Sequence, residues 1–290
     1  MALWLDHPEL FWLEERCDIS VVMSGAKVKE ITISVPTYYS ESSTQLLAMK
    51  KNMENNVNRI KNNIDTYRVR TDIDKVVYAH DYLTSTLKYN RAALSAATGS
   101  MPNAFNAYGA LINSTDGVVC QGYAKAFQLI CKKLGVDCIV VMGNASDTNY
   151  GDTHSWNYVK IYGEWYFTDV TADDINAGNV NPYNYKYFLR PMPTSYHEDI
   201  IWENINMANG FAILYGDVDD SGYLTANDVS AIHQLVLDES FKTYLTYSGA
   251  VACEVTDGKE ITIADASAVW QAVTDTDYIL PIYSAFSRWN

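Results

Sequence analysis

The sequence predicts an α+β fold followed by a small all-α module. In the first half of the chain, apolar residues recur at spacings of three and four, as they do on the buried faces of helices. The segments after it alternate around a Tyr-Gly pair, as hairpin strands do, and two acidic loops near the C-terminus each precede a short helix. The 290 residues suffice for two domains, which we place at residues 1–210 and 211–290.

The composition indicates an acidic globular protein. The formal net charge is −14, and 48% of the residues are hydrophobic. This charge disfavours binding to nucleic acid or to anionic membranes, and it favours solubility and cation binding. No run of 18 apolar residues predicts a membrane span. The first residues are unlike a signal peptide, so a secretory signal could have been trimmed from the chain.

The N-terminal elements follow from the hydrophobic pattern. Residues 4–40 are expected to form short strands, because apolar and polar residues alternate between Ile31 and Val35. A helix from about Asp72 to Lys88 and a loop region at 91–118 are predicted further on. Another helix is predicted between the strands of residues 4–40 and the helix that starts at Asp72. Its apolar face is formed by Leu46, Met49, Met53, Val57, Ile60 and Ile64.

A third helix is predicted from Cys120 to Leu134, and Gly135 is its expected C-terminal stop. The residues after this helix predict three strands of a sheet. These strands are expected at Asp137–Met142, His154–Ile161 and Trp165–Val170.

Cys120 is the candidate nucleophile among five cysteines. The five are odd in number and include no Cys-x-x-Cys pair, so neither a disulfide framework nor a zinc site is predicted. Cys131 and Cys138 fall in apolar stretches and are expected in the core. Cys120 instead starts a helix, where backbone N–H groups and the helix dipole stabilise a thiolate and a developing oxyanion. Gly117 and Gly122 suit a tight turn and a close backbone approach there.

His154 and Asp169 are the expected partners of this thiol. Tyr162-Gly163 suits a two-residue hairpin turn, in which residue 161 faces 164, 156 faces 169 and 154 faces 171. Asp169 is then the diagonal neighbour of His154, roughly 7–8 Å away between backbones and within side-chain reach. Such a carboxylate can fix the imidazole tautomer and stabilise its cation.

The other histidines have weaker settings. His80 is the main rival, but it lies on an apolar helix face without an acidic partner in its sequence context, so a satisfied core residue is expected. His7, His197 and His233 have no comparable surroundings.

Three segments together resemble the transglutaminase-like family. They are Cys120-Gln-Gly-Tyr-Ala-Lys-Ala-Phe, His154-Ser-Trp-Asn-Tyr-Val-Lys-Ile and Trp165-Tyr-Phe-Thr-Asp-Val-Thr. The resemblance covers roughly residues 4–190 and implies a papain-like core, in which the cysteine-bearing helix packs on an antiparallel sheet. It also implies Cys120 as nucleophile, His154 as base and Asp169 as orienter. Asp169 is followed by Val-Thr-Ala where many members carry Pro-Thr-Trp, and Gln121 and Tyr108 are candidate oxyanion donors.

The C-terminal region begins with a close match to a calcium loop. Oxygen ligands fall at positions 1, 3, 5, 9 and 12, the Tyr carbonyl falls at position 7, and Gly222 occupies position 6 for the sharp turn. A helix is expected to follow at Val229–Leu237. The candidate calcium ligands are Asp217, Asp219, Ser221, Tyr223, Thr225 and Asp228.

A second copy of the loop starts at Glu254 and precedes a predicted helix at Ala266–Val273. Its Asp-Gly pair comes one position early, so weaker or altered coordination of the cation is possible. The candidate ligands in this copy are Glu254, Thr256, Asp257, Thr262 and Asp265.

Two loop–helix copies without the entering helix of an EF-hand resemble a dockerin. The resemblance covers about residues 212–275 and implies structural Ca²⁺ and a cohesin module on a cellulosome scaffold as partner. It also implies that residues late in each loop face the cohesin, namely Ala226, Asn227, Ile263 and Ala264.

The leading hypothesis is a secreted, cellulosome-bound cysteine peptidase that cleaves amide bonds in peptides or proteins and needs no cofactor for catalysis. Transfer of the acyl group to an amine would instead make it a protein-glutamine transferase, and the sequence leaves this choice open. A non-catalytic module that binds peptide or wall polymer on the same fold is the competing class. A glycosidase is not favoured, because the sequence contains no recognisable pair of catalytic carboxylates.

Overall fold

The structure is a computed structural model. It describes residues 2–13, 18–34, 39, 41–97, 99–112, 114–145, 153–176, 185–191, 197–199, 205, 207–208, 210–256 and 260–282.

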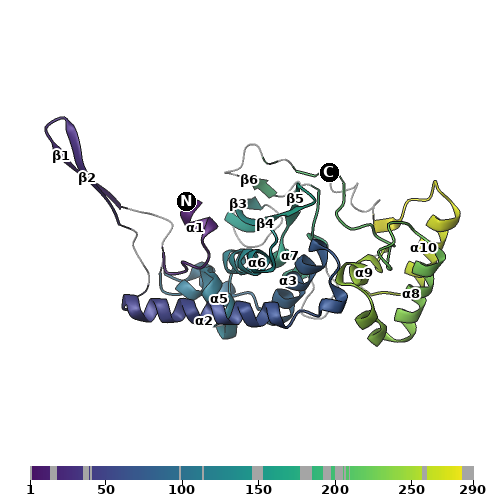
Figure 1. Ribbon diagram of the computed structural model, residues 1–290. Helices are drawn as coiled ribbons and strands as arrows, with labels where there is room; N and C mark the ends of the chain where they lie inside the picture. The colour runs from purple at the N-terminus through teal and green to yellow at the C-terminus, as the bar shows by residue number, and fades with distance from the viewer. Residues whose placement is uncertain are drawn as a thin grey trace.

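The centre of the molecule is a four-stranded antiparallel sheet with one helix packed on it (Figure 1). Helix α6 (Cys120–Leu134) packs on β3 (Cys138–Ala145) and β4 (Thr153–Ile161), and β4 pairs in turn with β5 (Glu164–Thr168). The short β6 (His197–Asp199) pairs with the other edge of β3. The predicted α+β class is therefore confirmed.

Two buried amides fix α6 on this sheet. The Nδ2 group of Asn157, on β4, donates to the carbonyl of Ala124 at 3.0 Å and to that of Ile139 at 3.1 Å. On α6, Gln128 Nε2 donates to the carbonyl of Cys138 at 3.2 Å. Because a displaced helix would leave these buried amides without partners, they define the register between α6 and the sheet.

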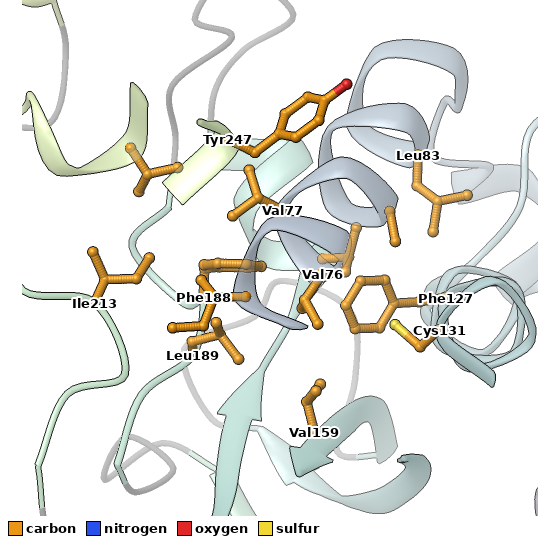
Figure 2. Packing of buried hydrophobic residues seen from close by; sticks show 14 of the residues in the cluster. Val76, Val77, Leu83, Phe127, Cys131, Val159, Phe188, Leu189, Ile213 and Tyr247 are labelled. Carbon is orange, nitrogen blue, oxygen red and sulfur yellow. The ribbon is translucent and has the colours of Figure 1, made fainter. Parts of the chain in front are cut away.

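Helices α2 (Ser43–Asn62), α3 (Asp72–Thr86) and α5 (Ala107–Leu111) cover the other side of α6. Both long helices begin with a capping box, Ser42 with Gln45 in α2 and Thr71 with Asp74 in α3. In the common core, the side chain of Val76 from α3 lies near Phe127 and Cys131 from α6 (Figure 2).

The segment predicted as a loop at 91–118 contains more structure than expected. It forms α4 (Arg91–Ser95), α5 and two 3₁₀ turns, at Pro102–Phe105 and Ser114–Asp116. A further 3₁₀ turn, Thr66–Arg68, precedes α3. These pieces are too short for the helical periodicity used in sequence analysis, and Asn side chains cap both α4 and α5.

The N-terminal prediction of strands is correct only in part. Residues Ala2–Asp6 form a helix, α1, whereas β1 (Asp18–Ser24) and β2 (Lys27–Ser34) form an antiparallel hairpin. Val35 lies outside the described residues. Every residue of the hairpin is exposed, and Figure 1 shows it extending away from the rest of the molecule.

The hairpin between β4 and β5 has the predicted turn. Tyr162 and Gly163 both have positive φ, 51° and 90°, as a type I′ turn requires, and Ile161 pairs with Glu164. Pairing ends at Asn157 with Thr168, because the chain then turns into α7 (Val170–Asn176). The predicted facing of residue 156 with 169 and of 154 with 171, and the strand to Val170, are therefore wrong.

The C-terminal region contains α8 (Ala226–Leu237), a 3₁₀ segment (Glu239–Tyr244), α9 (Tyr247–Ala252) and α10 (Ile263–Thr274). Helices α8 and α10 pack against each other. Both begin three residues earlier than predicted, because Thr225 and Thr262 cap them.

This region packs directly on α3. The buried carboxylate of Asp74 has one oxygen in the α3 capping box, and its other oxygen accepts from the backbone N–H and the hydroxyl of Ser248 at 2.8 and 2.6 Å. Arg68 donates to the carbonyl of Leu245 at 2.9 Å and lies 4.1 Å from the ring centroid of Tyr247. Figure 2 shows Tyr247 beside Val77, in a core that continues across the contact.

No helix in the described ranges is long and apolar enough to span a bilayer.

The contact at Asp74 makes a testable contribution to stability. Asp74→Ala removes a helix cap and the acceptor of the buried Ser248 N–H, whereas the Ser248 hydroxyl keeps Asp220 as an acceptor at 3.2 Å. We therefore expect a loss on the order of 3 kcal/mol in the free energy of unfolding, measured with urea. The matched control is Asp72→Ala on the same turn, whose exposed pair with Lys75 predicts a loss below about 1 kcal/mol. Equal losses for both variants would contradict the assigned role of Asp74.

Candidate active site

Cys120 is the first residue of α6. The residue before it, Val119, contributes no side-chain hydrogen bond to the helix start, in contrast to the capping boxes of α2, α3, α8 and α10. The first-turn N–H groups of α6 are therefore not occupied by a capping side chain. Together with the helix dipole, they favour negative charge on the sulfur or on an oxygen bound beside it.

Two glycines permit this helix start. Gly117 has φ +75°, and a Cβ added to it would lie 2.5 Å from the carbonyl oxygen of Lys88. A Cβ on Gly122 would lie 2.6 Å from the Cβ of Val118 and 3.0 Å from the carbonyl oxygen of Ala104. Both positions therefore require glycine for the chain to approach its neighbours this closely.

His154, near the start of β4, is held by Asp169. Its Nε2 atom lies 2.7 Å from Asp169 Oδ2, and both side chains are buried. The other carboxylate oxygen, Oδ1, accepts from the backbone N–H of Ala172 at 3.0 Å, at the start of α7. Although the strand pairing ends before residue 169, the turn into α7 thus directs this carboxylate at the imidazole.

The environment of His154 favours its protonated form. Burial disfavours the imidazolium, but the charge and the hydrogen bond of Asp169, and then a hydrogen bond with Cys120, outweigh burial and raise the pKa of His154 well above its usual value. Since Asp169 holds Nε2, the ring nitrogen left for the thiol is Nδ1. The structure therefore brings Cys120, His154 and Asp169 into one contiguous group.

The remaining described cysteines lie elsewhere in the core. Cys120 is 8% exposed, whereas Cys131, Cys138 and Cys253 are at most 2% exposed. Burial and the neighbouring Cys138 raise the pKa of Cys131, and burial raises that of Cys253. These thiols are accordingly poor nucleophiles. Cys17 lies outside the described residues.

The two candidate oxyanion donors lie on different helices, and only Gln121 is next to Cys120 in the sequence. Gln121 follows Cys120 on the first turn of α6 and lines a cavity there. Tyr108, on α5, stacks on Phe11 with ring centroids 4.6 Å apart.

His80 has two acidic partners, and one of them, Asp81, is the next residue in the sequence, so the expectation of no acidic partner in its sequence context is wrong. This buried side chain on α3 lies between two carboxylates, with Nε2 3.1 Å from Asp173 and Nδ1 3.0 Å from Asp81. Burial opposes its charge, but the two carboxylates raise its pKa to about 9. The core location was expected, whereas the partner Asp173 lies 93 residues away and no local signal indicates it.

The His80 group supports the loop that carries Asp169. Asp173 accepts from the backbone N–H of Tyr187 at 2.9 Å, and the carbonyl of Tyr187 accepts from the N–H of Asp169, also at 2.9 Å. Asp81 accepts from the Tyr185 hydroxyl at 2.7 Å. Helix α3 is thereby connected through the 185–188 segment to the carboxylate that contacts His154.

The first acidic loop brings three carboxylates together. One oxygen from each of Asp217, Asp219 and Asp228 lies within 4.8 Å of the others. Burial raises the pKa of Asp217, although hydrogen bonds from the backbone of Gly222 and Ser221 lower it. The neighbouring charges of Asp228 and Asp219 raise it further. A bound cation would reduce the repulsion between these carboxylates.

The remaining candidate ligands of the first loop lie around these carboxylates. Ser221 donates through its backbone N–H to Asp217 and through its hydroxyl to the carbonyl of Tyr223, at 2.9 and 3.0 Å. The Thr225 hydroxyl lies 3.0 Å from Asp228 Oδ2 and caps α8.

The second acidic loop repeats backbone contacts of the first but has a threonine where the first has Asp219. Asp265 accepts from the N–H groups of Val255 and Thr262 at 2.9 and 2.8 Å, as Asp228 does from Val218 and Thr225. The Thr256 hydroxyl, at the position equivalent to Asp219, donates to Asp265 at 2.8 Å. Glu254 accepts from the N–H of Thr256. Asp257 lies outside the described residues, and among those described only the first loop gathers three carboxylates.

The exposure of Cys120 predicts selective alkylation. In the folded protein, iodoacetamide should modify Cys120 before Cys131, Cys138 and Cys253, because only Cys120 combines some exposure with a base. Mass spectrometry of tryptic peptides measures the order, and urea-unfolded protein, in which all thiols react, is the control. His154→Gln should slow the labelling, and comparable rates at all cysteines would exclude an activated Cys120.

The His80 group predicts a pH-dependent stability. Its pKa is raised to about 9 from an ordinary 6.5, so its contribution is fully present below pH 6.5 and is lost as the pH rises through about 9. The difference in urea midpoint between the wild type and His80→Gln should therefore shrink between pH 6 and pH 10. His233→Gln, at an exposed position on α8, is the control. A difference that does not change with pH would show that His80 is neutral.

Comparisons with known proteins agree with this geometry. Residues 59–170, which include Cys120, His154 and Asp169, match the model of the Transglutaminase-like superfamily.

The human kyphoscoliosis peptidase is 29% identical over 149 residues, which are 47% of this chain and 22% of that protein. The mouse kyphoscoliosis peptidase is 32% identical over 100 residues, 30% of this chain and 15% of that protein. The chain thus spans about a fifth or less of the length of these relatives. The crystal structure of a TGase matches 54% of this chain and 44% of its own, with 15% identity and a TM-score of 0.36. Residues 59–170 are thus similar to the Transglutaminase-like superfamily, by the family model alone.

Proposed function

We propose that this protein is a thiol hydrolase that cleaves amide bonds in peptides through an acyl-enzyme on Cys120. The observation that carries the proposal is the buried His154–Asp169 pair next to a cysteine at an uncapped helix start. The similarity to the kyphoscoliosis peptidases supports a peptidase activity.

Each group in the site has a role in this chemistry. His154 accepts the thiol proton, and the thiolate attacks the carbonyl carbon of the substrate amide. The oxyanion that forms lies near the first-turn N–H groups of α6, and Gln121 is the candidate side-chain donor. His154 then protonates the leaving amine, and Asp169 stabilises the imidazolium in the meantime.

The second half of the reaction determines its class. His154 removes a proton from water as the water attacks the thioester carbonyl. The carbon–sulfur bond then breaks, the carboxylic acid leaves, and His154 returns its proton to the thiolate of Cys120. An amine in place of water would give acyl transfer, as in a protein-glutamine transferase. The His154–Asp169 pair can activate either water or an amine, so analysis of the products distinguishes hydrolysis from acyl transfer.

For the C-terminal region we propose a dockerin that binds structural Ca²⁺ and docks the protein to a cohesin of an extracellular cellulosome. The three clustered carboxylates of the first loop support calcium binding. The Thr256 hydroxyl in the second loop replaces one carboxylate and supports a weaker second site. At the helix starts, Ala226, Asn227, Ile263 and Ala264 are all exposed, as a cohesin-facing surface requires.

The catalytic roles are tested with a peptide library digested by intact protein and by variants. Cys120→Ala should lower kcat/KM by at least about 10³-fold, because the nucleophile is lost. Asp169→Asn should lower it by about 10²-fold or more, since the imidazolium loses its counter-charge. Asp116→Asn, at an exposed position, is the matched control. Undiminished cleavage by Cys120→Ala would refute the proposal.

Calcium binding is tested by titration calorimetry. Asp219→Asn should weaken the first site by about tenfold or more, because a carboxylate ligand is lost from the cluster. Wild-type affinity should also fall at acidic pH, since the pKa of Asp217 is raised and protons compete with the cation. Asp277→Asn, an exposed acid outside the loops, is the control. If chelation of calcium leaves cohesin binding unchanged, the dockerin assignment is wrong.

A further inference from the structure

The hairpin of β1 and β2 has an apolar face that no described part of the chain covers. Its register places apolar residues directly opposite each other at three levels, so six apolar side chains share one face. Each of these side chains belongs to a residue that is 49–63% exposed. We call this set the apolar hairpin face, and its three pairs are Ile19 with Ile33, Val21 with Ile31, and Met23 with Val28.

A β-bulge keeps the apolar hairpin face continuous. In a regular strand Val28 and Ile31 would point to opposite faces, because they are three residues apart. The register shifts between Val22 and Met23, and this shift brings Val28 onto the face of Ile31. Regular pairing would instead place Lys29 opposite Met23. The irregularity thus replaces a charged residue by a third apolar pair.

The opposite face of the hairpin is mostly polar. Within the two strands, Val22 is its one hydrophobic residue, and it lies opposite Glu30. Antiparallel strands with this alternation pack on one side and face water on the other. An isolated two-stranded hairpin is marginally stable in water, and a further layer on its apolar side stabilises it. The pattern therefore indicates a surface that another layer covers.

A second copy of this chain fits the apolar hairpin face. The face carries no charged side chain, so it complements an identical face and offers a charged partner no ion pair. At these exposures, the six residues present roughly 600 Å² of surface, and two copies would bury about 1,200 Å². This area reaches the lower end of the range for specific protein interfaces.

The length of the hairpin makes this contact compatible with the charge of the chain. Each copy carries a net charge of −14, which opposes the close approach of two copies. The eight residues of β2 span roughly 26 Å, and the hairpin extends away from the rest of the molecule (Figure 1). That distance is about three Debye lengths at physiological ionic strength, so the charges of the two bodies are largely screened when only the hairpins meet.

We propose that two copies of this chain associate through the apolar hairpin face, with one hairpin packed on the other. The contact is related by a two-fold axis, so each copy contributes the same six residues. Four strands in two layers then replace two isolated hairpins. No residue of the candidate active site lies in β1 or β2, so this inference is independent of the proposed thiol chemistry.

The association is measured by sedimentation equilibrium of the whole chain at concentrations from about 1 to 200 μM. We expect a monomer–dimer equilibrium with a Kd on the order of 10 μM, as suits an interface at the lower end of the size range. Added NaCl should strengthen the association, because the contact is apolar and the net charges repel. A chain that remains monomeric over this range, or a dimer that dissociates in salt, would overturn the inference.

The face used for association is tested with two neighbouring substitutions. Ile31→Lys places a charge on the apolar hairpin face of both copies and should raise Kd by at least about tenfold. Thr32→Lys, the matched control, places the same charge on the polar face and should leave Kd unchanged. Equal effects of the two substitutions would contradict face-to-face packing.

A milder variant keeps the test valid if Ile31→Lys does not form the hairpin. Ile31→Thr retains a β-branched side chain suited to a strand and should still raise Kd several-fold, because apolar surface is lost from both copies. Flotation with neutral phosphatidylcholine vesicles tests the other occupant. A monomeric chain that binds these vesicles, and loses this binding in Ile31→Lys, would assign the face to a lipid surface and overturn the dimer.

Discussion

The register between α6 and β4 is the constraint on which the rest of the site depends. Cys120 belongs to the helix and His154 to the strand, so their contact requires that the two elements meet in one fixed arrangement. The amide of Asn157 sets this arrangement by donating to a carbonyl of α6 and to one of β3 at the same time. Because these groups are buried, any slip of the helix would cost the full desolvation of unpaired amides.

Local patterns were sufficient to predict the parts of the site that are close in sequence. The start of α6 at Cys120 and the turn at Tyr162-Gly163 follow from helix periodicity and turn chemistry, and the family match at residues 59–170 agrees with the resemblance seen in the motifs. The turn into α7 could not be predicted, because strand alternation simply continues through Asp169. Asp173 could not be predicted as a partner of His80 because tertiary packing alone brings it there, whereas Asp81 is the next residue in the sequence.

The two acidic loops share the same backbone contacts at their final aspartate, but they differ in the side chains that could bind a cation. Asp228 and Asp265 accept equivalent N–H groups and cap equivalent helices, so the fold of each copy depends on the aspartate that ends the loop. Among the positions that differ, Asp219 in the first loop is replaced by Thr256 in the second. A carboxylate there adds charge for a cation, whereas a hydroxyl satisfies the aspartate within the protein.

Helix α3 contacts both the C-terminal region and the segment that supports the candidate active site. At its start Asp74 holds Ser248 of the C-terminal region, and two turns later His80 holds the loop beneath Asp169. A protein built this way does not carry its C-terminal region on a loose tether. If residues 211–290 are held by a scaffold, Cys120 has a fixed orientation relative to that scaffold. The rigid geometry, and not diffusion on a flexible linker, then determines which neighbouring polymers Cys120 can reach.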